Sequence, residues 1–240
     1  MVLRGVNLGP GADPEDMVSI RMWVDEKRII SAQQRQLLSV NDACESLEQK
    51  SPDGTPDILL RILARLVERI NCVIDTLEDR AAELENVVME ATEQEQRARL
   101  SSLRREAIML RRYLAPQREA LGRMLTELPS WFGELDRLHL REIYDRQVRL
   151  VEDLDSVRER LGVIHEELVS RLSDQLNKRM YVLSIVAALF LPLSFLTGLL
   201  GINVAGIPGE EYPHAFWIFT GMLVILVAFQ MWFFVRKKWF

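Results

Sequence analysis

The sequence has little of the chemistry that an enzyme or a disulfide-bonded domain requires. Its 240 residues include two cysteines, Cys44 and Cys72, which are too few for a disulfide framework and show no CxxC spacing. Cys72 lies in an apolar helical segment, RINCVID, and is expected to be a buried, inert thiol. The three histidines, at 139, 165 and 214, are widely spaced, and no HExxH, GxSxG or P-loop motif occurs. We therefore expect neither an enzyme nor a bound cofactor.

Basic charge is missing from most of the C-terminal quarter of the chain. Between residues 180 and 235 there is no Lys or Arg, and the only acidic residues are Glu210 and Glu211. Two uncharged segments, 180–201 and 215–235, each span roughly 30 Å as a helix, which matches the hydrocarbon core of a bilayer. We expect two transmembrane helices, with the lipid bilayer as a partner; a buried hairpin of a soluble protein is the alternative. The net charge of −5 gives no argument for nucleic-acid binding.

Basic residues flank both expected spans, and these are Lys178, Arg179, Arg236, Lys237 and Lys238. The loop between the spans, 202–214, has none. Because cytoplasmic flanks carry the excess of Lys and Arg, we expect a multi-pass protein with both termini in the cytoplasm and a periplasmic loop. The basic tail, 236–240, is expected to be a cytoplasmic anchor.

Residues 1–56 are expected to form a β-containing part of a cytoplasmic domain. The segment VSIRMWVD alternates apolar and polar residues, and RIIS resumes an apolar run after a turn-like DEKR, which predicts a β-hairpin. Since an isolated two-stranded hairpin is only marginally stable, more sheet is needed around it.

Helix breakers are scarce after residue 56. We expect cytoplasmic helices over 57–129, the second of them over about 96–127, and a third helix that is capped by Ser130 and starts at Trp131. A 4-3-4-3-4 spacing, typical of a coiled coil or bundle, relates Leu150, Leu154, Val157, Leu161, Ile164 and Leu168. This third helix is predicted to be a long stalk over 130–179 that continues without a break into the span 180–201. The predicted fold is an α-helical membrane protein with two spans per subunit and a cytoplasmic helical and αβ domain.

The first span carries small and hydroxylated residues, including Ser194, Thr197 and Gly201, which suit a wet path or close helix packing. Two spans cannot enclose a pathway in one chain, so a pore requires several copies around an axis. Asn177 and Asn203 would add rings of carboxamide oxygens for a hydrated cation. A membrane-anchored coiled-coil scaffold without transport is the alternative of another class.

The segment Gly-Ile-Asn at 201–203, directly after a span ending in LPLSFLTGLLG, resembles the Gly-x-Asn signature of the CorA-type metal ion transporter superfamily. The longer wording GINVAGIPG looks like the ZntB zinc-transport branch, and the likeness extends upstream through RGVNLGPGADPEDMVSIRMWVD. This resemblance implies a homopentamer in the cell inner membrane, a funnel-shaped cytoplasmic αβα domain and a stalk helix that enters the first span. Relative to the family, the chain looks N-terminally truncated.

The resemblance also implies roles for individual residues. Gly201, Ile202 and Asn203 would form the outer selectivity ring, where Asn203 meets the hydrated ion, and Ser194 and Asn177 would line the pore further in. The outer loop would attract cations through Glu210 and Glu211, with His214 beside them as a candidate proton or zinc group.

The transported ion is expected to be Zn²⁺, with Mg²⁺, Co²⁺, Ni²⁺ and Cd²⁺ as other candidates. Proton coupling is implied by the zinc branch, whereas a CorA-like magnesium or cobalt channel is the alternative within the superfamily. Without the surrounding context, GINVAGIPG would be only a helix C-cap followed by a tight turn.

Overall fold

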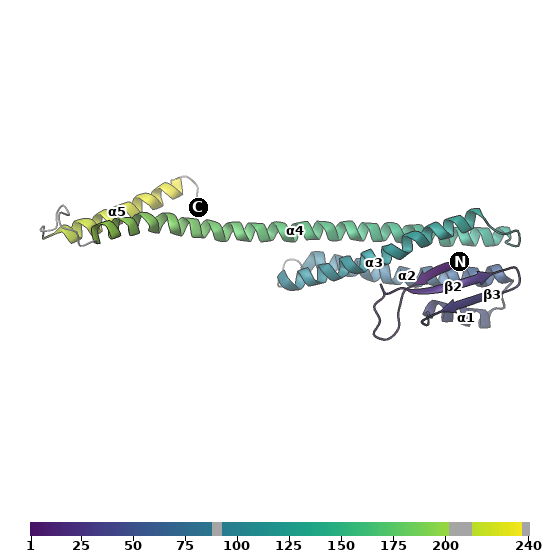
Figure 1. Ribbon diagram of the computed structural model, residues 1–240. Coiled ribbons are helices and arrows are strands. Elements are labelled where there is room, and N and C mark those ends of the chain that lie inside the picture. The colour runs from purple at the N-terminus through teal and green to yellow at the C-terminus, as the bar shows by residue number, and fades with distance from the viewer. Residues whose placement is uncertain (88–92, 202–212, 237–240) are drawn as a thin grey trace. The chain divides into compact units, whose positions relative to one another are not determined.

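The computed structural model describes residues 1–87, 93–201 and 213–236 of the chain. It divides into two compact units, Met1–Glu167 and Leu168–Phe240, whose boundary falls inside one long helix, α4 (Figure 1).

The first unit begins with a three-stranded antiparallel sheet in the order β1-β2-β3: β1 Val2–Gly5, β2 Val18–Val24 and β3 Ile29–Gln33. In the register, Leu3 pairs with Ile20, and Trp23 pairs with Ile30. The predicted hairpin is therefore confirmed, and β1 supplies the additional strand that it needs. The tight turn between β2 and β3 is fixed by Asp25, whose Oδ1 accepts the backbone N–H groups of Lys27 and Arg28 at 2.8 and 2.9 Å.

Three helices follow the sheet: α1 Leu38–Gln49, α2 Thr55–Val87 and α3 Glu93–Thr126. Helix α1 was not predicted from the sequence. This helix is held by α2, because Arg69 forms a two-point ion pair with Asp42 and Arg61 donates to the carbonyl oxygens of Ser46 and Lys50 at 2.9 and 3.1 Å. A basic side chain at these last carbonyls stabilises the C-terminal end of α1, which has no basic residue in its own last turn.

The core of the first unit consists of Leu and Ile side chains from α2, α3 and the N-terminal part of α4. Fully buried members include Leu63, Leu66, Ile70, Leu77, Leu110, Leu114, Leu140, Leu154 and Leu161. Around this core, three ion pairs join the helices: Arg80–Glu106, Arg111–Asp155 and Arg160–Glu85. The spacing of three and four residues thus predicted a buried stripe correctly.

Two local expectations were wrong. Cys72 is exposed, because the buried positions of its turn are Val73 and Ile74, and Cys72 lies beside that stripe. The third helix, α4, starts at Glu134 and not at Trp131, since Asp136 Oδ2 accepts the backbone N–H of Gly133 at 3.0 Å and so closes the first turn there.

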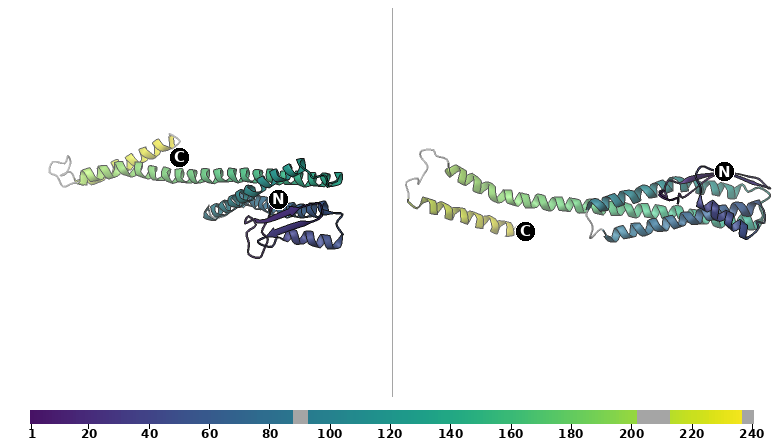
Figure 2. Two further views of the ribbon diagram at one scale, coloured as in Figure 1. Left: turned by 45° about the vertical axis from the view of Figure 1, so that its right-hand side comes forward. Right: turned by 90° about the horizontal axis from the view of Figure 1, so that it is seen from below.

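The second unit is a helical hairpin. Helix α4 runs from Glu134 to Gly201, 68 residues without interruption, and α5 runs from Ala215 to Arg236 (Figure 2). Within the second unit, α5 lies alongside the last part of α4 and runs in the opposite direction. Both helices are long and apolar enough to cross a membrane. The predicted stalk that continues into the first span is confirmed as a single helix.

Candidate ion pathway

One face of the α4 span is turned toward α5. The partly covered residues of this face are Ile185, Ala188, Leu189, Pro192, Leu193 and Leu196. A matching stripe on α5 consists of Phe219, Thr220, Leu223, Leu226, Val227 and Gln230. Both stripes repeat every three or four residues, so each is one face of its helix. We call the contact between these two stripes the seam.

The face of α4 opposite the seam carries three of the predicted pore residues, Ser194, Thr197 and Gly201. Each residue turns an α-helix by about 100°, so Ser194 lies roughly 180° around the axis from Ile185. Gly201 is two turns further along the same face as Ser194, and Thr197 is one turn from it, so we call this surface the Ser194 face. Its residues are exposed in the single chain. A symmetric assembly that placed α5 outermost would therefore direct the Ser194 face toward the axis.

The hydroxyl groups on the α4 span differ in what they can offer an ion. Thr197 Oγ1 donates to the carbonyl of Leu193 at 2.9 Å and also contacts that of Ser194 at 3.2 Å, so it presents only its lone pairs outward. Ser184 Oγ is committed in the same way to the Met180 carbonyl at 2.8 Å. Among the Ser and Thr hydroxyls of this span, Ser194 alone has no hydrogen bond to the described residues. Ser194 can thus both donate to and accept from the water shell of a cation.

The end of α4 is electrostatically suited to a cation. The last four carbonyl groups of a helix lack intrahelical partners and carry the negative end of the helix dipole. Here that end has no basic residue in its last turn, and a Cβ atom at Gly198 or Gly201 would meet nothing within 4 Å. The negative end of the α4 dipole therefore lies where Gly-Ile-Asn begins.

The other predicted site residues fall into two groups. Asn177 is exposed on α4 but lies about 100° around the helix from Ser194, on a different face. His214 is exposed in the turn before α5, and its carbonyl accepts the N–H of Ile218 at 3.1 Å. Ile202, Asn203, Glu210 and Glu211 lie outside the described residues. Their roles, like that of the cation at an Asn203 ring, stay predictions.

Two polar residues of α5 that were not predicted as site residues, Thr220 and Gln230, both lie on the seam. Thr220 Oγ1 is satisfied by the Phe216 carbonyl at 2.9 Å. Gln230 Oε1 is buried and has no donor among the described residues. The signal was available, because a single carboxamide in an uncharged span is unusual enough to indicate a specific partner.

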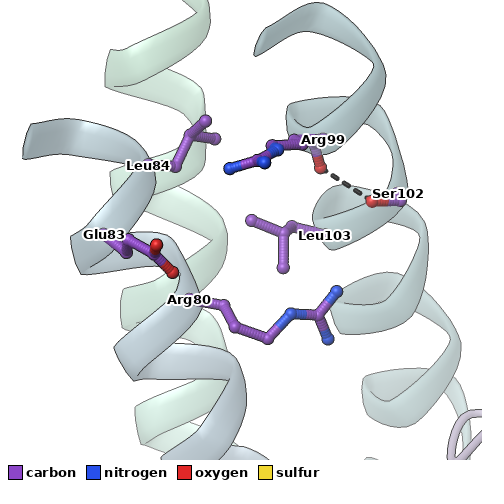
Figure 3. A pocket seen from close by; sticks show the side chains of 6 residues that line it. All are labelled: Arg80, Glu83, Leu84, Arg99, Ser102 and Leu103. Carbon is purple, nitrogen blue, oxygen red and sulfur yellow. Dashed lines mark hydrogen bonds between the residues drawn. The ribbon is translucent and has the colours of Figure 1, made fainter. Parts of the chain in front are cut away.

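The pockets of the first unit do not compete as a metal centre. A pocket of about 320 Å³ between α2 and α3 is lined by Arg80, Glu83, Leu84, Arg99, Ser102 and Leu103 (Figure 3). Arg80 pairs with Glu106 at 2.7 Å on α3, and burial raises the pKa of Glu106 against the opposing effect of Arg80. In the part of the chain that the structure describes, no three His, Cys, Asp or Glu residues are grouped as metal ligands would be.

Fold and span together define an α-helical membrane protein. Residues 1–238 match the model of the family described as "CorA-like Mg2+ transporter protein". The chain belongs to this family, whose named members are transporters and not enzymes.

Two curated relatives illustrate the relationship. The chain is 41% identical over 243 residues to the "Divalent cation transporter CmaX" of Pseudomonas aeruginosa, covering 99% of this chain and 72% of that protein. It is 37% identical over 240 residues to the "Zinc transport protein ZntB" of Yersinia pseudotuberculosis, covering 100% of this chain and 73% of that protein.

Solved structures agree on the fold. The full-length CmaX structure matches with a TM-score of 0.81 at 40% identity, covering 99% of this chain and 73% of that one. The complete CorA magnesium transporter from Methanocaldococcus jannaschii matches with a TM-score of 0.85 at 18% identity, covering 100% of this chain and 76% of that one, and at this identity it supports the fold alone.

Proposed function

We propose that the chain is the subunit of a homopentamer that transports Zn²⁺ across the cell inner membrane, with both termini in the cytoplasm. The observation that carries the proposal is the Ser194 face. It presents Ser194, Thr197 and Gly201 on the side of α4 away from α5, and it leads directly into Gly-Ile-Asn. Copies arranged around an axis would turn this uncharged polar face into rings.

Such rings suit a divalent ion that keeps its water shell. Hydroxyl, carboxamide and carbonyl oxygens can accept from or replace those waters without placing a fixed charge in the membrane. At the outer end, Asn203 would provide a carboxamide ring, and Glu210, Glu211 and His214 would raise the local cation concentration. In this proposal the Asn203 ring, which we call the pore mouth, selects the hydrated ion, and the Ser194 face lines the path that conducts it.

Zinc is favoured over magnesium by the sequence GINVAGIPG and by the 37% identity to a protein named for zinc transport. A magnesium or cobalt channel is the second candidate, because Gly-x-Asn is shared across the superfamily and the matching family model is named for Mg²⁺. Proton coupling is part of the zinc proposal. A coiled-coil scaffold without transport is disfavoured, since it gives the Ser194 face no role.

The test is flux into proteoliposomes that contain the full chain. We expect Zn²⁺ uptake that Mg²⁺ competes with poorly and that an imposed pH gradient changes. Asn203→Ala should reduce the flux by about tenfold or more, because a lost hydrogen bond to a charged ligand is worth roughly 1.5–3 kcal/mol. Asn71→Ala is the matched control, since Asn71 is exposed in the first unit, where its Nδ2 donates to Asp75 at 2.6 Å.

Unchanged flux in Asn203→Ala would overturn the assigned mouth. Preferential Mg²⁺ uptake without any effect of the pH gradient would favour the channel. Cross-linking of the reconstituted protein should stop at a pentamer, and a dimer or trimer combined with no flux would favour the scaffold.

A further inference from the structure

Two glutamines in this chain share an unusual environment. Gln147 on α4 and Gln230 on α5 each have a buried Oε1 atom with no donor among the described residues. Each also lies against a helix that contains a proline in its interior: Pro116 in α3 and Pro192 in α4. Since buried polar atoms are nearly always paired, this shared placement calls for an explanation.

The first pair shows what such a glutamine does. Gln147 is fully buried, and its Nε2 donates to the backbone carbonyl of Leu114 at 3.3 Å, two residues before Pro116. A proline has no N–H, so the helical turn before it has more carbonyl acceptors than backbone donors. In the first unit, therefore, a carboxamide from the neighbouring helix donates to a carbonyl in the turn before a proline, although the carbonyl that Pro116 itself leaves free is that of Arg112.

The membrane hairpin also has a proline in one helix and a glutamine on the neighbouring helix. Pro192 cannot donate to the carbonyl of Ala188, which would be its partner four residues earlier in a regular helix. Ala188, Pro192 and Gln230 all belong to the seam. Ala188 lies about 20 Å below the end of α4 at Gly201, and Gln230 lies about 22 Å from the start of α5 at Ala215, at 1.5 Å per residue. In an antiparallel hairpin whose two helix ends are level, the two residues would therefore lie at a similar depth.

Other partners on the seam are lacking. The side chains of α4 on this stripe are all apolar, and Ser184, on the neighbouring face, already donates to the Met180 carbonyl at 2.8 Å. In lipid, an unpaired backbone carbonyl and an unpaired carboxamide each cost several kcal/mol. Because the two ends of a carboxamide have nearly the same shape, the buried end can be the NH₂ donor.

We propose that Gln230 donates its carboxamide N–H to the Ala188 carbonyl that Pro192 leaves free, and that this hydrogen bond fixes α5 against α4. Gln230 is thereby a positioning residue, which holds the outer helix on the side of α4 opposite the Ser194 face. Its role in transport rests on the proposed function. The hydrogen bond itself does not.

A double-mutant cycle tests the bond without reference to transport. Gln230→Leu removes the donor, and Pro192→Ala restores the backbone N–H, so that Ala188 no longer needs the glutamine. Thermal unfolding of the full chain in detergent should show that Gln230→Leu lowers the midpoint by about 2–4 °C more in the natural background than in the Pro192→Ala background. Thr220→Val is the matched control on the same stripe, and its effect should be the same in both backgrounds.

Equal shifts of Gln230→Leu in the two backgrounds would overturn the proposal. Zn²⁺ flux in proteoliposomes then tests the positioning role. Gln230→Leu should lower the maximal rate and leave the half-saturating concentration unchanged, because Gln230 does not lie on the Ser194 face. A changed half-saturating concentration with an unchanged maximal rate would contradict this role. If no variant transports zinc, the proposed function fails while the thermal cycle still decides the hydrogen bond.

Discussion

The two units of this chain use the same residues in opposite ways. In the first unit most of the large aliphatic side chains form a buried core, in which Leu66 and Ile70 are at most 1% exposed. In the second unit they are outside: Leu191 and Ile225 are 69% and 70% exposed, and among the described side chains of its two spans Phe234 is the only buried large apolar residue. The difference shows which solvent each unit is built for, because an apolar exterior is stable in lipid and costly in water.

Polar groups follow the same division. The first unit has ion pairs across its helix contacts, such as Arg69–Asp42 and Arg111–Asp155. These charged side chains are partly exposed, so both water and the opposite charge stabilise them. The spans of the second unit have no charged side chain between residues 180 and 201 or between 215 and 235. In a bilayer each polar atom there needs a specific partner. The Ser194 face and Gln230 carry polar groups whose partners are the subject of the two proposals above.

The largest effect on membrane insertion should come from a lysine on the apolar surface of the second unit, compared with a lysine on the surface of the first unit. Ile225→Lys puts an ammonium at the centre of α5 and should abolish stable membrane insertion, since a lysine at mid-span costs about 2.5–3.5 kcal/mol on insertion scales. Leu138→Lys, at an exposed position of α4 in the first unit, should change stability by less than about 0.5 kcal/mol. The measurement is the fraction of expressed protein that stays in membranes after alkaline extraction.

If both lysine variants remained in the membrane equally well, the division between a water-facing and a lipid-facing unit would be wrong. An Ile225→Leu control should behave like the natural chain, because it keeps the apolar surface.

A smaller expected effect is a difference between the two units in how their stability depends on pH. The Arg69 guanidinium lowers the pKa of Asp42, and that of Arg111 lowers the pKa of Asp155, below the usual value of 3.8. A carboxyl whose folded pKa is depressed contributes stability that is present above the unfolded pKa and is lost as the pH falls through the folded one. The thermal midpoint of the first unit should therefore decrease as the pH drops below 3.8, whereas the spans, which have no carboxylate, should not respond.

The probe is far-UV circular dichroism of the full chain, with tryptophan fluorescence as a second signal. Asp42→Asn should lower the midpoint at neutral pH and flatten its acid dependence. Glu48→Gln is the matched control, because Glu48 is an exposed residue of the same helix with no ion pair among the described residues. An acid dependence that Asp42→Asn leaves unchanged would show that this pair is not its source.

The sequence predicted best what depends on long-range pattern. Two uncharged stretches of sufficient length require only a bilayer to become helices, and the spacing of Leu150, Leu154 and Leu161 requires only a neighbouring helix. Helix α1 was missed because its segment, LSVNDACESLEQ, has few apolar residues and no side-chain cap, and because Arg61 and Arg69 of α2 stabilise it. Strand β1 has four residues, and only its pairing with β2 makes it recognisable.

For the site, the residue types were predictable but their directions were not. Hydroxyls and glycines marked the first span as polar, yet the separation of Ser194 from Asn177 by about 100° depends on which face meets α5. Likewise, Gln230 is visible in the sequence as a single carboxamide, but its position on the seam opposite Ala188 and Pro192 follows only from the hairpin.

The most direct test of the central claim is the water accessibility of the Ser194 face. In a background with Cys44→Ser and Cys72→Ser, which removes both exposed thiols, Ser194→Cys should react with a charged, membrane-impermeant thiol reagent and should be protected by Zn²⁺. Leu196→Cys on the seam and Ile225→Cys on the outer surface of α5 are the controls and should stay unlabelled over the same time. If Ser194→Cys stays unlabelled, or reacts no faster than both controls, the Ser194 face does not line an ion pathway.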